Sequence, residues 1–212
     1  MIIHNLDGDG LEAVADTTIN PHFDMNGDGF AERAGWVRGG DAFLVQDNNA
    51  TGTIDDISEM FGSPTQDGYS ELATLDTNAD GKLDALDAAW STLKLWRDAD
   101  FDGVTDAGEL LTLDSQNIVS IAVNPTVTTP DEHTGFTITA TGTFTRADTS
   151  TGATGRDFSG LLSREGRSAR TRNPERSHIK ERFLPVIRQS AAAANDNCRF
   201  GGKTAVRVGD GR

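Results

Sequence analysis

Twelve residues from Asp98 to Glu109 carry oxygen-bearing side chains at the spacing that a calcium loop requires. In such a loop, side chains at positions 1, 3, 5 and 12 and the carbonyl of position 7 surround the ion, and a glycine at position 6 allows a sharp turn. The corresponding ligands here are Asp98, Asp100, Asp102, Glu109 and the carbonyl of Val104, with Gly103 at position 6. An acidic surface turn explains one Asp-Gly pair but not the whole register. The segment therefore predicts a Ca²⁺ site.

A second segment repeats the pattern with a weaker closing residue. Its predicted ligands are Asp76, Asn78, Asp80, the Lys82 carbonyl and Asp87, with Asp84 at position 9. Because an Asp at position 12 usually supplies one oxygen where a Glu supplies two, we expect this loop to bind calcium more weakly or to complete its shell with water.

Three further segments match the pattern in part. Their candidate ligands are Asp24, Asn26, Asp28, Phe30 and Glu32 in one loop, Asp47, Asn49, Thr51, Thr53 and Glu59 in another, and Asn5, Asp7, Asp9 and Asp16 at the N-terminus. Position 12 of the Asp24 loop is Gly35, so Glu32 or a carboxylate from elsewhere, such as Asp41, has to close it. Asp-Gly and Asn-Gly are also ordinary turn formers. Each of these loops is therefore either a calcium site or a turn without an ion.

The elements that position the loops are predicted from apolar spacing. Apolar residues recur at helical intervals between Leu86 and Trp96, which predicts one helix over 85–97 that joins the two strongest loops. At about 1.5 Å per residue, this helix would hold the two ions about 20 Å apart. We also expect helical turns at 57–61 and 69–75 and a last helix ending at 110–113.

Strands are predicted where β-branched and aromatic residues alternate with polar ones, at 35–37, 42–45, 118–123 and 136–145. The predicted fold class is α+β. In this interpretation the protein is a small, irregular, calcium-stabilised domain of EF-hand-like loops, short helices and β-hairpins, followed by a disordered tail.

Charge divides the chain. Residues 1–155 contain 27 acidic and 6 basic residues, whereas residues 156–212 contain 6 acidic and 13 basic residues. Repulsion in the acidic part opposes compaction until cations bind. The basic part has few bulky apolar residues, which is typical of disorder. We predict a calcium-binding module at 1–125, a β-hairpin or linker at 126–155 and a disordered tail at 156–212.

The order of several motifs resembles the calcium-binding module of FrpC-type RTX proteins from Gram-negative bacteria. The motifs are Leu6–Glu12, Phe23–Arg33, Gly35–Val37, Ile54–Asp56, Glu59–Gly62, Leu75–Asp76 and Leu95–Asp98. The resemblance implies secretion by a type I system. Some members of that family also carry out calcium-dependent self-processing. They cleave an Asp-Pro bond before the first loop and join the new acyl end to a lysine.

The sequence departs from that family pattern where processing would occur. The residues before the first loop are Met1-Ile2-Ile3-His4, and Pro21 follows Asn20, whose amide side chain cannot attack as a carboxylate would. The interpretation is therefore a non-enzymatic calcium-binding module of a secreted RTX-type protein. Two alternatives stay open: a remnant or partner of the Asp-Pro self-processing protease/ligase, and a dockerin-like adhesion module, because Trp90 and Leu93 follow the Asp76 loop.

Composition also bears on partners and location. The sequence has no apolar run long enough to span a membrane, and its N-terminus lacks a cationic segment followed by an apolar one. We therefore expect an extracellular protein exported without a Sec signal, or otherwise a cytoplasmic one. The expected partners are calcium ions and a protein partner or larger RTX-type assembly, without nucleic acid, because the basic tail lacks interleaved aromatic residues.

Overall fold

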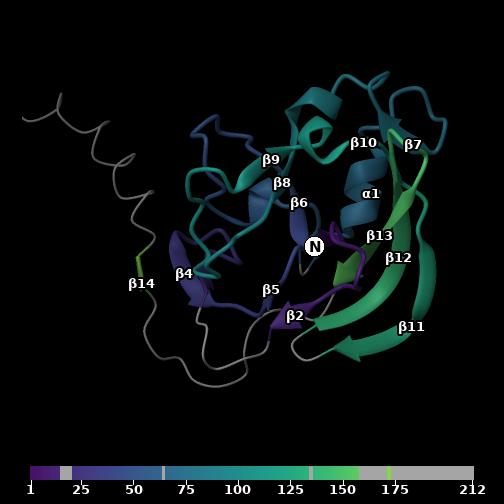
Figure 1. Ribbon diagram of the computed structural model, residues 1–212. Coiled ribbons are helices and arrows are strands. Elements are labelled where there is room, and N and C mark those ends of the chain that lie inside the picture. Colours follow the sequence, from purple (N-terminus) through teal and green to yellow (C-terminus); the bar gives the residue numbers. More distant parts are fainter. Residues whose placement is uncertain (15–20, 64, 134–135, 158–170, 173–212) are drawn as a thin grey trace, which may run out of the picture.

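The computed structural model describes residues 1–14, 21–63, 65–133, 136–157 and 171–172 (Figure 1). Most of the regular structure in these residues is antiparallel β-sheet, so the predicted α+β class is wrong. Within the described residues, the α-helical structure is confined to α1 (Gly68–Ala73). Three short 3₁₀ helices accompany it, η1 (Ile57–Glu59), η2 (Trp90–Thr92) and η3 (Asp114–Gln116).

A nine-stranded sheet forms the centre of the fold. Its order is β7 (Lys82–Asp84), β10 (Ile118–Ala122), β12 (Phe136–Arg146), β13 (Thr151–Asp157), β1 (Ile2–His4), β6 (Ala42–Gln46), β8 (Leu93–Trp96) and β9 (Leu110–Thr112), with β11 (Thr126–His133) paired to β12. The first strand lies between β13 and β6, so it connects the two halves of the sheet. The sheet curls, and α1 lies beside its curved strands in Figure 1.

Two smaller sheets complete the described strands. One contains β14 (Thr171–Arg172), β4 (Phe30–Arg33) and β3 (His22–Phe23), and the other pairs β2 (Ala13–Val14) with β5 (Trp36–Val37). The predicted strands at 35–37, 42–45, 118–123 and 136–145 are thus present, with small differences at their ends.

The central strands are buried on both faces. In β6, Ala42 and Leu44 pack into one apolar cluster with α1, while Phe43 and Val45 pack into a second cluster on the opposite face. This is the period-2 alternation of a strand, and burial on both sides explains why the run is continuously apolar. The second cluster contains Trp36 and Trp96 rings in edge-to-face contact, with centroids 5.3 Å apart.

The helix predicted over 85–97 is wrong. This segment instead contains the 3₁₀ helix η2 and the strand β8, which pairs with β6 and β9. Two causes are visible. The Asp84 side chain accepts the backbone N–H of Leu86 at 2.9 Å, a local bond that competes with helix formation. Leu86 itself is 75% exposed, so the expected apolar helix face is not buried.

The helix expected to end at 110–113 is also wrong, because these residues form β9. Leu95 of β8 faces Leu111 of β9 in an antiparallel pair, which makes the Asp98 loop the connection of a hairpin. The Asp24 loop likewise connects β3 to β4, with Phe23 opposite Glu32. These two calcium-type loops are therefore held by strands and not by flanking helices, and the 20 Å separation derived from a shared helix has no basis.

The two predicted helical turns do form, as η1 and α1. The Asp67 side chain caps α1 by accepting the Tyr69 N–H at 3.0 Å, and the Tyr69 hydroxyl lies 2.5 Å from Thr154 Oγ1 on β13. None of the helices in the described residues is both long and apolar enough to cross a bilayer. Apart from residues 156–157 and β14, the predicted disordered tail lies outside the described residues, and the proposed domain boundaries stay a prediction.

Candidate metal centre

The five predicted loops share one backbone signature. Position 4 has a positive φ in every loop, and its occupants are Gly8, Gly27, Ala50, Ala79 and Phe101. Position 6 also has a positive φ and is glycine each time, at Gly10, Gly29, Gly52, Gly81 and Gly103. Three position-4 residues are not glycine although the left-handed conformation disfavours a side chain. The loops therefore adopt a common ion-loop conformation that local propensity alone does not favour.

Four of the loops also share a hydrogen-bond pattern centred on the position-1 carboxylate. In each, one oxygen of this Asp accepts the N–H of the position-6 glycine. The N···O distances are 2.7 Å for Asp24, 2.8 Å for Asp47, 2.9 Å for Asp76 and 2.8 Å for Asp98. The bond turns the glycine N–H inward and fixes the bend. The sequence register of these four loops is therefore reproduced in three dimensions.

The same four loops are each closed by a second carboxylate, which accepts the N–H of position 2. The pairs are Met25 to Glu32 at 3.4 Å, Asn48 to Glu59 at 3.2 Å, Thr77 to Asp87 at 2.8 Å and Ala99 to Glu109 at 2.7 Å. Glu32 thus lies at the Asp24 loop, and Glu59 closes the Asp47 loop although it is one residue late. The Asp41 side chain instead accepts a hydrogen bond from the Glu12 N–H of the N-terminal loop.

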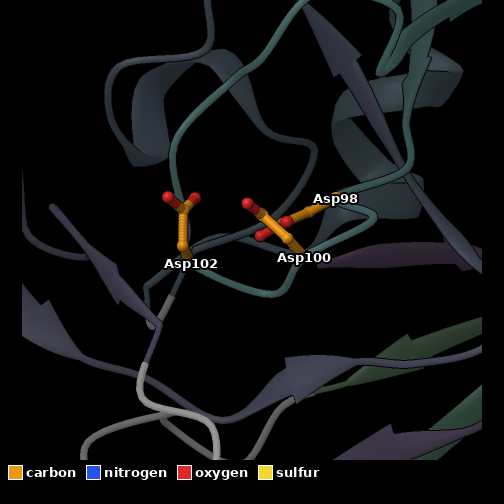
Figure 2. A group of neighbouring side chains, drawn as sticks. All are labelled: Asp98, Asp100 and Asp102. Carbon is orange, nitrogen blue, oxygen red and sulfur yellow. The ribbon is translucent and has the colours of Figure 1, made fainter.

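The most compact group of carboxylates belongs to the Asp98 loop. One oxygen from each of Asp98, Asp100 and Asp102 lies within 4.8 Å of the other two, and Figure 2 shows the three groups around a common space. Asp98 is only 2% exposed, whereas Asp100 and Asp102 are exposed. Glu109 is buried, and its Oε2 accepts the indole N–H of Trp96 at 3.3 Å. The loop is thereby connected to the aromatic cluster.

Burial makes this site unfavourable for its own negative charges. Desolvation raises the pKa of Asp98 to about 6, and the nearby Glu109 and Asp102 charges add to the shift. Desolvation also raises the pKa of Asp102 and, in the Asp47 loop, that of Glu59. A bound cation would relieve this repulsion and supply the missing solvation.

A lysine accompanies the carboxylates of the Asp76 loop. Lys82 Nζ lies 2.6 Å from Asp84 Oδ2 and 3.7 Å from Asp80 Oδ2. The hydrogen bond from Lys82 lowers the pKa of Asp84, and the bond from the Asp84 N–H lowers that of Asp87. Among the described ion pairs, a lysine side chain therefore contacts the carboxylates of the Asp76 loop, whereas none contacts those of the Asp98 loop.

Three loops contact one another through backbone groups and one threonine hydroxyl. Asp24 and Asp56 form a parallel bridge, which joins the Asp24 loop to the Asp47 loop. The Ile54 N–H donates to Thr105 Oγ1 at 3.0 Å, which joins the Asp47 loop to the Asp98 loop. The His22 N–H donates to the Asp102 carbonyl at 3.1 Å, which completes the connection to β3. An ion in one of these loops would stabilise its neighbours as well.

The N-terminal loop differs from the other four. Its leading residue Asn5 accepts the Gly8 N–H at 2.7 Å, and Asp7 accepts the N–H of Gly40, from a distant turn, at 3.0 Å. Asp41 accepts the Glu12 N–H at 2.6 Å, so it belongs to this loop. The predicted closing ligand Asp16 lies outside the described residues.

Several carboxylates near the loops were not predicted as their ligands, although the sequence places Asp84 at position 9 and offered Asp41 for another loop. Position 9 of three loops is a carboxylate residue, Asp55, Asp84 or Asp106. In each loop the closing carboxylate accepts the backbone N–H of this position-9 residue, at 2.7, 3.1 and 2.9 Å respectively. The register itself carried this signal, because position 9 commonly contributes through a water. Asp41 and Glu12 had no such signal, since they meet only through the tertiary fold.

The dockerin-like interpretation relied on Trp90 and Leu93 following the Asp76 loop on a helix. Both are buried in the core, at 9% and 2% exposure, and Leu93 begins β8. The helix that would present them as a binding face is not formed in this segment.

Comparison with known proteins places this loop-bearing sheet in a family. The SPM domain family matches residues 2–157, which include all of the described loops and the nine-stranded sheet. The chain therefore belongs to the SPM-domain family.

A curated relative narrows the relationship. The chain is 36% identical over 160 residues to the iron-regulated protein FrpA of Neisseria meningitidis serogroup C. The aligned part covers 71% of this chain but only 14% of FrpA, so the chain spans a small part of the length of that relative. The match supports the FrpC-type resemblance seen in the motifs and identifies an RTX-related module.

Proposed function

We propose that this protein is a calcium-binding module whose fold depends on the ion. The main support is the Asp98 loop, where three carboxylates meet within 4.8 Å and Asp98 is 2% exposed. Buried like charges are costly unless they are paired or coordinate a metal. No described ion pair involves Asp98, Asp100 or Asp102.

The donor set favours Ca²⁺ over other common ions. The side chains at positions 1, 3, 5 and 12 of the Asp98 and Asp76 loops offer oxygen atoms, together with the carbonyls of Val104 and Lys82. Calcium accepts six to eight oxygens in a flexible geometry, whereas zinc prefers nitrogen and sulfur, and magnesium keeps much of its water. We infer that the ligands are those predicted for the four loops that begin at Asp24, Asp47, Asp76 and Asp98, with Asp55, Asp84 and Asp106 at position 9.

Location follows from the same proposal. Extracellular calcium modules bind with dissociation constants of about 10⁻⁴ to 10⁻³ M, far above the concentration of free calcium in a cytosol. We propose that the protein is exported and gains its ions outside the cell, as part of a larger RTX-type protein. The relationship to FrpA, of which the chain matches 14%, is consistent with a module inside a longer chain.

Calcium titration of the purified protein tests the function. Because Trp96 donates to Glu109, binding at the Asp98 loop should change tryptophan fluorescence, and calorimetry should give the number of ions. Glu109→Gln and Asp98→Asn should each remove one ion. Asp148→Asn, in the exposed turn between β12 and β13, removes the same charge and should bind as the wild type does. Unchanged stoichiometry in both loop variants would show that the Asp98 loop is not a calcium site.

We further propose that this chain binds calcium without cleaving itself, because its sequence contains no Asp-Pro bond. Protein incubated with millimolar calcium should keep its intact mass. Mass spectrometry would detect fragments, and a calcium-dependent break after Asn20 would instead support the self-processing alternative.

A further inference from the structure

A carboxylate outside the four matching loops is buried without a complete set of partners. Asp41 is 2% exposed, and its Oδ1 has no hydrogen-bond partner in the structure. Its Oδ2 accepts the Glu12 N–H at 2.6 Å. An unpartnered carboxylate oxygen in a buried position costs free energy unless a ligand satisfies it.

Three acidic side chains of the N-terminal loop act on this carboxylate through their charges. Burial raises the pKa of Asp41 to about 7, and the charges of Asp7, Asp9 and Glu12 add to the shift. The glycine turn before Asp41 brings two of them close. Asp7 accepts the Gly40 N–H at 3.0 Å, and a side chain added at Gly39 would collide with the Glu12 carboxylate.

The negative charges in this group have no recorded counter-charge. None of the ion pairs among the described residues involves Asp7, Asp9, Glu12 or Asp41. The carboxyl groups of Asp7 and Asp9 share a hydrogen bond with each other, which lowers the pKa of Asp7 and raises that of Asp9. Two carboxyl groups whose charges act on a third that is buried and unsatisfied form a strongly cation-attracting set.

We propose that Asp41, together with Asp7, Asp9 and Glu12, forms a further calcium site that does not follow the twelve-residue loop register. Asp41 Oδ1 is its fixed, buried ligand. The other three carboxylates are less tightly grouped than those of the Asp98 loop, because no three of the four meet within 4.8 Å. The exposed side chains of Asp9 and Glu12 therefore rotate toward Asp41 when the ion binds.

The site would link distant parts of the chain. Asp7, Asp9 and Glu12 follow β1, whereas Asp41 lies directly before β6, the strand that pairs with β1. An ion held by both segments would secure the connection between these neighbouring strands. The choice of calcium rests on the proposed function, whereas the existence of a cation site rests on the unpartnered Asp41 oxygen.

Asp41→Asn tests the proposal, because it removes the charge and keeps the shape. Calorimetry with calcium should show one ion fewer than in the wild type, while Glu12→Gln should weaken binding of that ion. Asp114→Asn, on the exposed helix η3, is the matched control and should bind every ion. The double variant Asp41→Asn with Asp98→Asn should lose two ions, because the sites are separate.

Thermal unfolding separates a ligand role from a structural one. Without calcium, Asp41→Asn should unfold at a higher temperature than the wild type, because a buried charge has been removed. Adding calcium should then raise the unfolding temperature of Asp41→Asn by less than it raises that of the wild type. The proposal would be wrong if Asp41→Asn bound as many ions as the wild type. It would also be wrong if the substitution changed the unfolding temperature by the same amount with and without calcium. If Asp98→Asn loses an ion and Asp41→Asn does not, the further site is wrong while the proposed function stands.

Discussion

Single carboxylates in these loops accept backbone hydrogen bonds with the same oxygens that we propose as calcium ligands. In the Asp98 loop, Asp98 Oδ2 accepts the Gly103 N–H at 2.8 Å, and Oδ1 accepts the Phe101 N–H at 2.7 Å. Each oxygen has a further lone pair that is free to face an ion. The backbone bonds therefore hold the ligand in place before calcium arrives, which reduces the ordering that binding has to impose.

Lys82 is the residue whose removal should strengthen a calcium site. Its ammonium group contacts Asp80 and Asp84 in the Asp76 loop, where it competes with calcium for the same oxygens. Exposed ion pairs are weak, so Lys82→Gln should raise calcium affinity at this loop by no more than about 5-fold. Calorimetry at low salt measures the change, with Lys94→Gln on β8 as the control. An unchanged or lower affinity would show that the lysine does not compete.

The raised pKa of Asp98 predicts how pH affects the calcium-free protein. Its pKa is about 6 in the folded state, above the usual value of 3.8, so the folded protein binds this proton more tightly than the unfolded chain. The contribution of Asp98 to stability is therefore largest at low pH and is lost as the pH rises from about 4 to about 6. Calcium competes with the same proton, so its affinity should fall below pH 6.

Urea unfolding in calcium-free buffer at several pH values tests this sign. The difference in unfolding free energy between the wild type and Asp98→Asn should move in favour of the variant as the pH rises from 4.5 to about 7. A difference that stays constant with pH would mean that Asp98 titrates normally.

At the scale of elements, the turn glycines have unequal roles. Gly103 and Gly27 both have positive φ, at 80° and 71°. A Cβ at Gly103 would lie 2.7 Å from the His22 carbonyl oxygen, whereas a Cβ at Gly27 would have no atom within 4 Å. Gly27→Ala should cost about 1–2 kcal/mol from backbone strain alone, and Gly103→Ala should cost more because it separates the Asp98 loop from β3. Chemical denaturation with calcium present compares them, and equal losses would argue against this loop contact.

The loop conformations were predictable because a local pattern determines them, whereas the flanking elements were not. The spacing of Asp98, Asp100 and Asp102 fixes both ligand order and the glycine turn within a few residues. In contrast, Leu93 and Leu95 fit a helix or a strand, and only pairing with β6 and β9 selects the strand. That choice depends on residues about 50 positions earlier. For the same reason, the sequence offered Asp41 as a possible ligand of the Asp24 loop and did not indicate its contact with Glu12.

At the scale of the whole molecule, three of the calcium-type loops contribute side chains to the second apolar cluster. The second apolar cluster includes Met25, Ile54 and the partly buried Phe101, which belong to the Asp24, Asp47 and Asp98 loops. Their burial against the sheet therefore depends on the loops being folded. Since residues 1–155 contain 27 acidic and 6 basic residues, charge repulsion opposes this arrangement when no cation is bound.

We therefore expect calcium to control the compactness of the molecule. Binding free energy adds to folding free energy when the unfolded chain has no formed site, and one site at about 100 times its dissociation constant adds roughly 2.7 kcal/mol. Several sites together would supply much of the margin of a small domain, which is about 5–15 kcal/mol. Without calcium, the loops should open around a sheet that still unfolds cooperatively, so the radius of gyration should increase but stay well below the roughly 50 Å of an unfolded chain of this length.

Small-angle scattering and amide exchange with and without EDTA measure this transition. The loss of protection on chelation should begin in β3, β4 and β9, which the Asp24 and Asp98 loops connect. β12 and β13 pair along seven residue positions and should keep protection longest. Magnesium at the same concentration is the control for ionic strength and should not restore the compact state. Equal scattering and equal protection with and without EDTA would mean that the carboxylate loops decorate a sheet that is stable by itself.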